Sequence, residues 1–378
     1  MRRLAAGGLV VAALLTAACA SRRVDEPTLW ADAHAEETTL LSRAAVYDDP
    51  ALLAYLDELG QRLVGAALPF QVLRDPTLNL FALPDGHVFV HTGVLAVTEN
   101  EAQLAALLAH EIAHVFHRDA FEVGAPPRIA SLEGPVGASR TADAIRVQGL
   151  RLTAEAAITG YGRARERAAD GAGVASLVRA GWDPKQAPVI YLRLAAQSLE
   201  GGPREVFFLG NRGRLGERIE TTRDLVATAF APAAAVTTTV TDSAAFDRLV
   251  RPVLRENAYE EVRRGRFAAA RQQLDRVLAA SPADGLAWVY LGDLHRLQAQ
   301  RARSADERVA ARREARAAYE RALEGDAPPA EAHRQLGLLY YETNDLEQAR
   351  AELRAYLALA PGAPDAQRIG EYVTGLDR

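Results

Sequence analysis

Glu101–His117 reads EAQLAALLAHEIAHVFH and contains neither Gly nor Pro. Its apolar residues recur at helical spacing, which predicts a helix with a buried face. His110 and His114 are four residues apart and therefore project from one side of that helix. Two such imidazoles can bind one Zn²⁺, and Glu111 can reach a water there as general base. The alternative is a pair of ordinary hydrogen-bonded core histidines; the HExxH spacing favours the metal.

The composition is that of a globular protein, with 378 residues, 49% hydrophobic and 25% charged. This length is enough for about two domains. The formal net charge is −5, so no basic surplus points to nucleic acid, and we expect no nucleic-acid partner. Arginines do cluster in 301–316, but Glu and Asp lie among them, which is typical of a solvated helix face.

The first residues are predicted to form a secretory signal peptide, 1–18. Two arginines precede an apolar run that is too short for a membrane span of roughly 20 residues. The run ends in LTAAC, which resembles a bacterial lipobox with Cys19 as its lipid-modified residue. The alternative is a plain signal peptide. Because at least two acyl chains give stable anchoring, we expect Cys19 to hold the mature chain on a membrane. With Ala20 next, we expect the periplasmic face of the outer membrane.

Composition and turn signals divide the rest of the chain into four parts. The first three are a polar tether, an α+β domain that is mostly helical with a small sheet, and an Ala/Thr-rich linker. The fourth is an all-α domain. The predicted boundaries are 19–45, 46–225, 226–250 and 251–378. Within the α+β domain we predict helices at 48–68, 141–160, 162–180 and 184–199, strands at 70–73, 78–82 and 87–91, and a Gly/Pro-rich loop at 124–139.

The last part of the chain repeats. Its residues fall at the spacing of about three tetratricopeptide repeats, each a helical hairpin that buries its apolar face only by stacking on a neighbour. The alternative is an unrelated helical bundle. The residues that carry the pattern are Ala258, Ala270, Leu274 and Pro282; Trp288, Leu291, Gly292, Ala315, Tyr319 and Ala322; and His333, Leu336, Gly337, Tyr340, Ala349, Leu353, Tyr356 and Pro361.

A catalytic zinc needs a third protein ligand and leaves its fourth position to water. The best candidate is Glu166, within RARERAAD at 163–170. Asp170 lies four residues later on the same predicted helix, where it can accept a hydrogen bond from a ligand histidine and fix its tautomer. The alternative for this segment is a solvated helix face, because three arginines lie beside the two carboxylates.

Four stretches together resemble a known family: NLFALPDG (79–86), HVFVHTG (87–93), ENEAQLAALLAHEIAHV (99–115) and RARERAAD. They resemble the membrane-associated zinc metallopeptidases of the HtpX, LoiP and BepA type, a gluzincin group with HExxH followed by ExxxD. The resemblance implies a minigluzincin-like domain with one Zn²⁺ per chain, Glu166 as third ligand and Asp170 as partner of a ligand histidine. A repeat array after this domain is similar to the BepA type, and a lipobox to the LoiP type.

One segment departs from the group's pattern. Where relatives carry a His and a Pro, the stretch GNRGRLGERI (210–219) has Arg212 and Gly213. A gating role assigned to that His in some relatives is therefore in doubt for this chain. Arg218 matches the group's Arg, which implies a group that stabilises the oxyanion; the alternative is a structural salt bridge.

These features predict a zinc endopeptidase of the bacterial envelope that degrades misfolded or stalled envelope proteins. An extended substrate would pair with a strand edge, for which we expect His87, Val88, Phe89, Val90 and His91. The repeats would dock substrate or a protein partner. The alternative function is an assembly chaperone or adaptor for outer-membrane proteins with a gated or vestigial site. A purely structural zinc needs a fourth protein ligand, and no further Cys or His at a fixed spacing supplies one.

Overall fold

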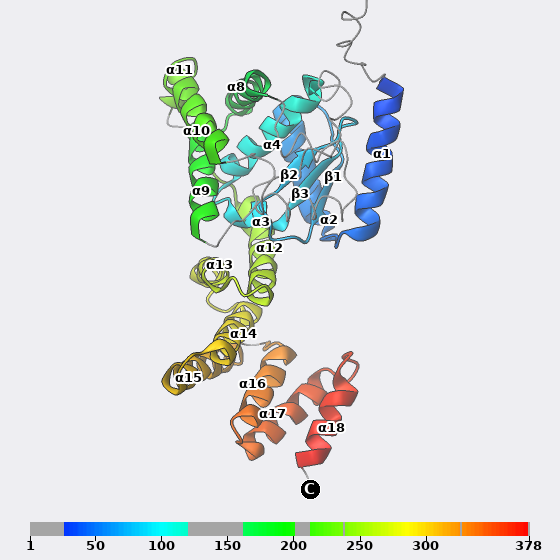
Figure 1. Cartoon of the computed structure of the whole chain (residues 1–378), viewed down its shortest axis with the longest axis vertical. Helices are drawn as coiled ribbons and strands as arrows, with labels where there is room; N and C mark the ends of the chain where they lie inside the picture. The colour runs from blue at the N-terminus through cyan, green and yellow to red at the C-terminus, as the bar shows by residue number, and fades with distance from the viewer. Residues whose placement is uncertain (1–25, 120–161, 201–211, 237–238, 326, 377–378) are drawn as a thin grey trace, which may run out of the picture.

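The computed structural model describes residues 26–119, 162–200, 212–236, 239–325 and 327–376, and the element labels used below are those of Figure 1. The predicted signal peptide with Cys19, the loop 124–139 and the helix 141–160 lie outside these residues. Helices predominate around one small sheet, which confirms the predicted fold class. Within the described ranges, no helix combines the length and the apolar character that crossing a membrane requires.

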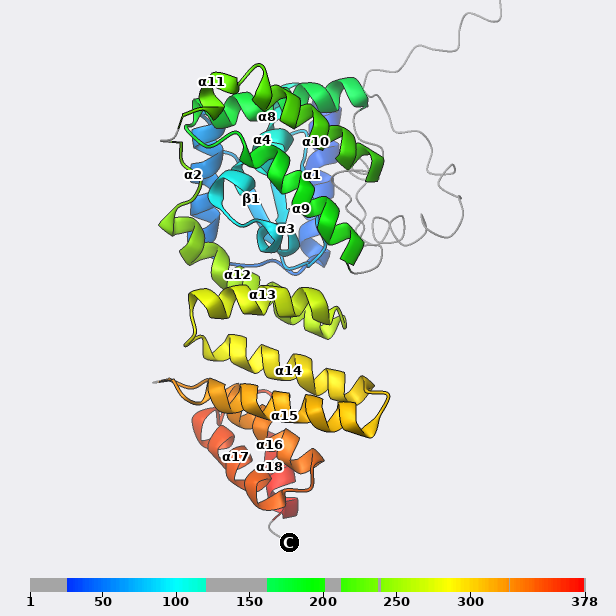
Figure 2. The ribbon, with the colours of Figure 1, turned by 90° about the vertical axis from the view of Figure 1, so that its left-hand side faces the viewer.

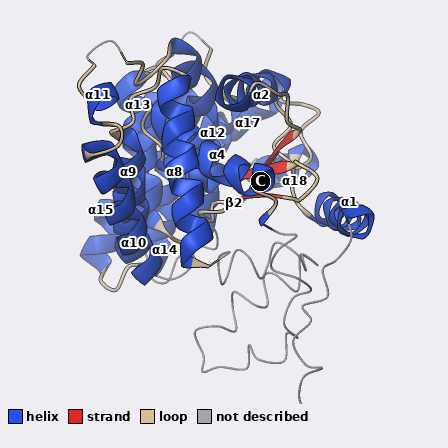
Figure 3. Ribbon diagram, turned by 90° about the horizontal axis from the view of Figure 1, so that it is seen from above, coloured by secondary structure: helices blue, strands red, loops and turns tan. Residues whose placement is uncertain are grey.

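A three-stranded sheet lies at the centre of the first domain, in the order β1-β3-β2. Its side chains alternate between two faces, as strand geometry requires. On one face Phe81 and Phe89 stack at 5.1 Å between ring centroids and pack against Leu40 of α1, whereas Val88 and Val90 join the main core on the other. The sheet therefore separates α1 from α2 and α4 (Figure 1, Figure 3). The bounds are α1 Glu26–Arg43, α2 Pro50–Val64, β1 Phe70–Leu73, β2 Leu80–Ala82, β3 Val88–His91, α3 Thr92–Val97 and α4 Glu101–Phe116.

Helix α4 runs through the core of the domain. Asn100 caps its start by accepting a hydrogen bond from the Gln103 N–H, and every residue of 101–114 is buried. Its first residue, Glu101, is 2% exposed and accepts hydrogen bonds from Tyr55 Oη at 2.9 Å and Trp182 Nε1 at 2.8 Å. A buried carboxylate held by several donors fixes the position of a helix end, because leaving it unpaired would be costly.

Three later helices pack on the side of α4 opposite to α1 (Figure 1, Figure 2). Helix α8 comes closest, because a Cβ added at Gly173 would lie 3.4 Å from the backbone nitrogen of His110. A small residue at this point lets the two helix backbones approach each other. The helices are α8 Arg163–Arg179, α9 Gln186–Glu200 and α10 Arg212–Ala227.

The segment predicted as a linker contacts the first domain. It contains the short helix α11 (Ala231–Ala234), and Val240 forms a β-bridge with Trp182. Thr241 accepts a hydrogen bond from the Ala102 N–H at 3.0 Å, and Asp242 Oδ1 accepts one from the Glu101 N–H at 3.2 Å. These bonds attach the chain just before the repeats to the first turn of α4.

Successive helices then stack as hairpins below the first domain (Figure 2). A Cβ added at Gly292 would meet the ring of Tyr319 at 2.2 Å, and one at Gly337 would meet Leu353 at 2.8 Å, so each glycine lets its helix pack closely on the next. Both glycines belong to the predicted repeat pattern. The helices are α12 Ala244–Arg263, α13 Phe267–Ala280, α14 Gly285–Arg301, α15 Ala305–Ala322, α16 Ala330–Glu342, α17 Leu346–Leu359 and α18 Ala366–Leu376.

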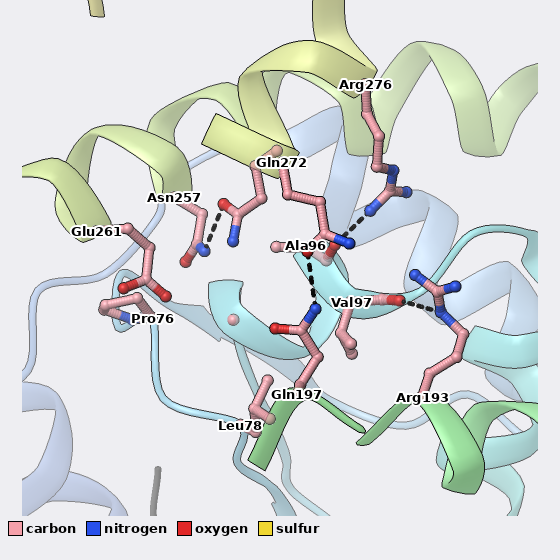
Figure 4. A pocket seen from close by; sticks show the side chains of 12 residues that line it. Pro76, Leu78, Ala96, Val97, Arg193, Gln197, Asn257, Glu261, Gln272 and Arg276 are labelled. Atoms are coloured by element: carbon pink, nitrogen blue, oxygen red, sulfur yellow. Dashed lines mark hydrogen bonds between the residues drawn. The ribbon is translucent and has the colours of Figure 1, made fainter. Parts of the chain in front are cut away.

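The first repeat hairpin joins the first domain through polar contacts around a small cavity between α3, α9, α12 and α13 (Figure 4). Arg276 of α13 donates to the Ala96 carbonyl at 2.6 Å and to the Thr98 carbonyl at 2.7 Å. Arg193 of α9 donates to the Val97 carbonyl at 3.0 Å. These cations therefore satisfy the last carbonyls of α3, which an isolated helix end leaves without partners.

Candidate metal centre

The two histidines of the HExxH motif face each other near the end of α4. The Nε2 atoms of His110 and His114 are 3.0 Å apart, and the residues are 1% and 5% exposed. One helical turn separates them, so the rigid helix alone brings both rings to one side. Two nitrogen atoms bound to one zinc at about 2.0–2.1 Å in tetrahedral geometry lie roughly 3.3 Å apart, close to this separation.

Glu166 brings a carboxylate to the same point from α8. Its Oε2 is 3.4 Å from His110 Nε2, and its Oε1 is 3.8 Å from His114 Nε2. The three side chains thus present two imidazole nitrogens and a carboxylate to one small volume. This donor set fits a catalytic zinc, which takes three protein ligands and keeps one position open.

Glu111 lies at the edge of this group, with Oε1 3.9 Å from His110 Nε2. His110, Glu111 and His114 also form a compact set of possible metal ligands. Glu166 approaches both ring nitrogens, whereas the Glu111 carboxylate also accepts a hydrogen bond from the backbone N–H of Ala82. This arrangement favours Glu166 as a ligand and leaves Glu111 beside the three donors.

Asp170, one turn after Glu166 on α8, lies behind the first histidine. Its Oδ1 is 2.9 Å from His110 Nδ1, and the residue is 3% exposed. The same oxygen accepts hydrogen bonds from Arg218 Nη2 at 2.7 Å and Nε at 3.1 Å. The Asp170 carboxylate therefore links His110 of α4 to Arg218 of α10.

Arg218 is itself buried beside Tyr191 of α9. Its guanidinium lies 4.2 Å from the centre of the Tyr191 ring, and Nη2 donates to the hydroxyl oxygen. Tyr191 also donates to Asp170 Oδ1 at 3.4 Å. This part of the network was not predicted, because nothing in the sequence near Tyr191 marks it as close to α8 and α10.

A second carboxylate that the sequence analysis missed lies behind the other histidine. Asp119 Oδ2 is 2.6 Å from His114 Nδ1, and Asp119 is 4% exposed. Its position five residues after His114, just beyond the helix, is the only signal for it that the sequence holds.

Comparison with known proteins agrees with this geometry. Residues 59–207 match the model of peptidase family M48, and residues 255–312 and 305–364 match a tetratricopeptide repeat model. The chain contains an M48 peptidase domain. Repeats follow this domain, which confirms the predicted resemblance for both parts of the chain. An M48 domain also implies a metal, so the fit of the three donors agrees with the family.

Curated relatives match mainly over the M48 domain. The putative beta-barrel assembly-enhancing protease of Vibrio cholerae is 33% identical over 195 residues, which cover 48% of this chain and 40% of that protein. The beta-barrel assembly-enhancing protease of Escherichia coli K12 is 33% identical over 174 residues, or 42% and 36%. The mitochondrial metalloendopeptidase OMA1 of Schizosaccharomyces pombe is 33% identical over 136 residues, or 36% and 40%. The chain therefore spans less than half the length of each of these relatives.

Burial sets the electrostatics of the M48 site. It raises the pKa of Glu111 to about 8, although the charges of His110 and Arg218 and the Ala82 N–H oppose this shift. Glu166 is also desolvated, yet its hydrogen bond and charge interaction with His110, together with Arg218, hold its pKa well below the usual range. Two glutamates in one site thus have pKa values pushed apart, which is the pattern of one group that transfers protons and one that stays ionised.

The histidines are affected by the same neighbours. Burial and the Arg218 charge lower the pKa of His110, but its bonds to Asp170 and Glu166 outweigh them and raise it. For His114 burial is the larger effect, and the pKa falls despite the hydrogen bond to Asp119. A neutral imidazole is the form that binds metal. Each histidine can therefore act as a ligand through Nε2 only when the ring proton is on Nδ1.

The predicted substrate edge, His87–His91, is wrong. Strand β3 pairs with β1 on one side and β2 on the other, so it is the central strand of the sheet. The third strand along the chain inserts between the first two, which its sequence does not reveal. Its last residue, His91, is 2% exposed and faces Thr77 Oγ1 at 2.8 Å, and burial lowers the pKa of this ring to about 4.

Strand β2 is the edge strand of the sheet that lies against α4. The His91 N–H bonds to the Asn79 carbonyl, and the Leu83 N–H bonds to the His87 carbonyl. Antiparallel bonds alternate in direction along a strand, so the backbone groups of residues 80 and 82 point away from β3. The bond from the Ala82 N–H to Glu111 agrees with this direction.

Three other residues named in the predictions, Arg212, Cys19 and His87, do not join the group of metal donors in the described part of the chain. Arg212 starts α10, and its side chain lies outside the described part, as does Cys19. His87 lies between Glu37 Oε1 at 3.2 Å and Asp85 Oδ2 at 3.1 Å, in contact with α1 rather than with the M48 donors.

Proposed function

We propose that the chain is a zinc-dependent endopeptidase that binds one Zn²⁺ through His110, His114 and Glu166. The convergence of these three donors beside Glu111 is the observation that carries the proposal. When bound, zinc acts as a Lewis acid that polarises a carbonyl and lowers the pKa of water. Two imidazole nitrogens with one carboxylate are a donor set that suits zinc, which supports this choice of metal.

Glu111 carries out the proton transfers in this mechanism. Its carboxylate takes a proton from the attacking water and delivers it to the leaving amine nitrogen. A pKa near the working pH suits both steps, and burial raises the pKa of Glu111 to about 8. The backbone of Ala82 interacts with this carboxylate, so strand β2 lies beside the base.

We propose that β2, rather than β3, holds the substrate. An extended peptide can pair with the outward backbone groups of Leu80 and with the Ala82 carbonyl, and this would place a scissile bond beside Glu111. Hydrogen bonds between main chains depend little on the side chains of the substrate. Selectivity would then depend on whether a segment is unfolded enough to enter as a strand, which suits misfolded or stalled proteins as substrates.

The bacterial relatives named beta-barrel assembly-enhancing protease support a place in the bacterial envelope. We propose that lipidated Cys19 anchors the chain to the outer membrane and that the repeats dock substrate or an assembly partner. Arg218 donates two hydrogen bonds to Asp170 and one to Tyr191, so we assign it first to holding Asp170.

The decisive experiment measures zinc content and cleavage of an unfolded protein such as casein by the full chain in detergent. Glu111→Gln should retain zinc but cleave roughly 10²–10⁴-fold more slowly, because a general base contributes on that order. Chelator should abolish wild-type cleavage. Glu58→Gln, an exposed change on α2, is the matched control. Full cleavage by the Glu111→Gln variant would rule out Glu111 as the base, whereas zinc binding without any cleavage by the wild type would overturn the peptidase and favour a chaperone or adaptor.

A further inference from the structure

Asp119 is the feature that the M48 mechanism above leaves unused. Its Oδ2 lies 2.6 Å from Nδ1 of His114, while Nε2 of the same ring faces His110 and Glu166. One ring nitrogen thus points to the donor group and the other to a buried carboxylate. A carboxylate accepts the proton of Nδ1–H, which leaves the Nε2 lone pair directed at the donors.

The backbone at the end of α4 is shaped to bring Asp119 there. The helix ends at Phe116, and the N–H groups of His117 and Arg118 bond to carbonyls of the last turn. Arg118 has φ of 57°, in the left-handed region that residues other than glycine seldom adopt. Such a conformation is strained and persists where its surroundings hold it. It turns the chain so that Asp119 returns beneath the His114 ring.

The second oxygen of Asp119 connects to the helix that supplies the third donor. Asp119 Oδ1 is 3.5 Å from Arg165 Nε, and Arg165 precedes Glu166 on α8. Asp119 therefore contacts a candidate ligand on α4 and the neighbour of another on α8. The arrangement matches that of Asp170, which lies between His110 and Arg218. Each histidine thus contacts an aspartate through Nδ1, and that aspartate in turn contacts an arginine.

We infer that Asp119 is a positioning residue of the metal centre. It holds His114 in the tautomer and orientation that bind the metal, and through Arg165 it ties this histidine to the helix of Glu166. The inference rests on the proposed zinc centre at His110, His114 and Glu166. Partners of this kind usually change metal affinity by about 10–100-fold when they are removed.

The test compares zinc affinity of the full chain in detergent, by competition with a coloured chelator, for wild type, Asp119→Ala and Asp119→Asn. We expect Asp119→Ala to weaken zinc binding about 10–100-fold. Asp119→Asn should fall between the two, because an amide oxygen still accepts the Nδ1–H bond but carries no charge. The visible absorption of the cobalt-loaded protein should change in Asp119→Ala, since that spectrum reports the geometry of the ligands.

Asp183→Ala is the matched control, because Asp183 is a buried aspartate outside the centre whose carboxylate accepts a hydrogen bond from the Lys185 N–H at 3.0 Å. Its zinc affinity and cobalt spectrum should equal those of wild type. Thermal melting of each metal-free variant shows whether it is folded, and if Asp119→Ala is not, Asp119→Asn decides. Wild-type affinity in the folded Asp119 variants overturns the inference. Absence of zinc binding by the wild type is a different result, which overturns the proposed centre itself.

Discussion

The Nε2 atoms of His110 and His114 lie 3.0 Å apart in a site where neither residue is more than 5% exposed. Two lone pairs at this distance repel each other unless a proton or a cation lies between them. Burial prevents water from relieving the contact. The M48 domain should therefore be more stable with metal than without it.

Metal removal should lower the melting temperature of the M48 domain. Zinc at about 100 times its dissociation constant adds about 2.7 kcal/mol, which corresponds to roughly 5–10 °C for a domain of this size. Calorimetry of the full chain with zinc and with chelator measures the shift. The same comparison in His110→Ala, which lacks one donor, should show little change. An equal shift in that variant would mean that the metal binds elsewhere.

Replacing Arg218 with Met should destabilise the M48 domain strongly. Asp170 is 3% exposed, and loss of the guanidinium leaves its buried carboxylate without its main charge partner. Breaking such a pair costs about 3–5 kcal/mol. Urea unfolding measures the loss. Arg163→Met is the control, since Arg163 also joins α8 to α10, through Glu217, but is 83% exposed, and it should cost less than about 1 kcal/mol.

The sequence predicted the parts of the site that local spacing determines. The helix over 101–117 is observed as Glu101–Phe116, so the relation of His110 to His114 could be read from the i, i+4 pattern alone. Glu166 was a weaker inference from spacing, because its meeting with α4 depends on how α8 packs. The family resemblance supplied that tertiary information.

Other features depend on tertiary structure that no local pattern carries. The strands were predicted close to their observed ranges, yet their order was not, because strand order depends on crossovers. Asp119 could not be placed, since its contact with His114 requires the left-handed backbone at Arg118. The Ala/Thr-rich segment reads as a linker, but its Thr241 and Asp242 bond to the start of α4.

Gly292→Ala should destabilise the repeats. A Cβ at this position would lie 2.2 Å from the ring of Tyr319, which is fully buried and cannot move away without disturbing its neighbours. Overpacking of this kind costs about 1–3 kcal/mol. Urea unfolding followed by circular dichroism measures the effect. Gly370→Ala in α18, where an added Cβ meets nothing within 4 Å, should be neutral or slightly stabilising.

The repeats should also lose stability as the pH rises from about 4 to 7, because of Asp293. Burial raises the pKa of this carboxyl to about 6, although hydrogen bonds from Tyr319 and Gln335 oppose the shift. The unfolded chain should titrate near the ordinary value of 3.8. Between these values the folded state binds more protons, so the contribution of Asp293 is fully present below about 3.8 and is lost as the pH passes about 6.

Asp293→Asn isolates this contribution, since the amide keeps the size and one acceptor but does not titrate. The free energy of unfolding of the wild type, relative to Asp293→Asn, should fall by about 1–3 kcal/mol across this pH range. Urea titrations at several pH values, with circular dichroism as the signal, provide the measurement. Asp275→Asn, an exposed change on α13, should give a profile parallel to the wild type. If the Asp293→Asn profile is also parallel, the pKa of Asp293 is the same in the folded and unfolded states, and its pH-dependent contribution to stability does not exist.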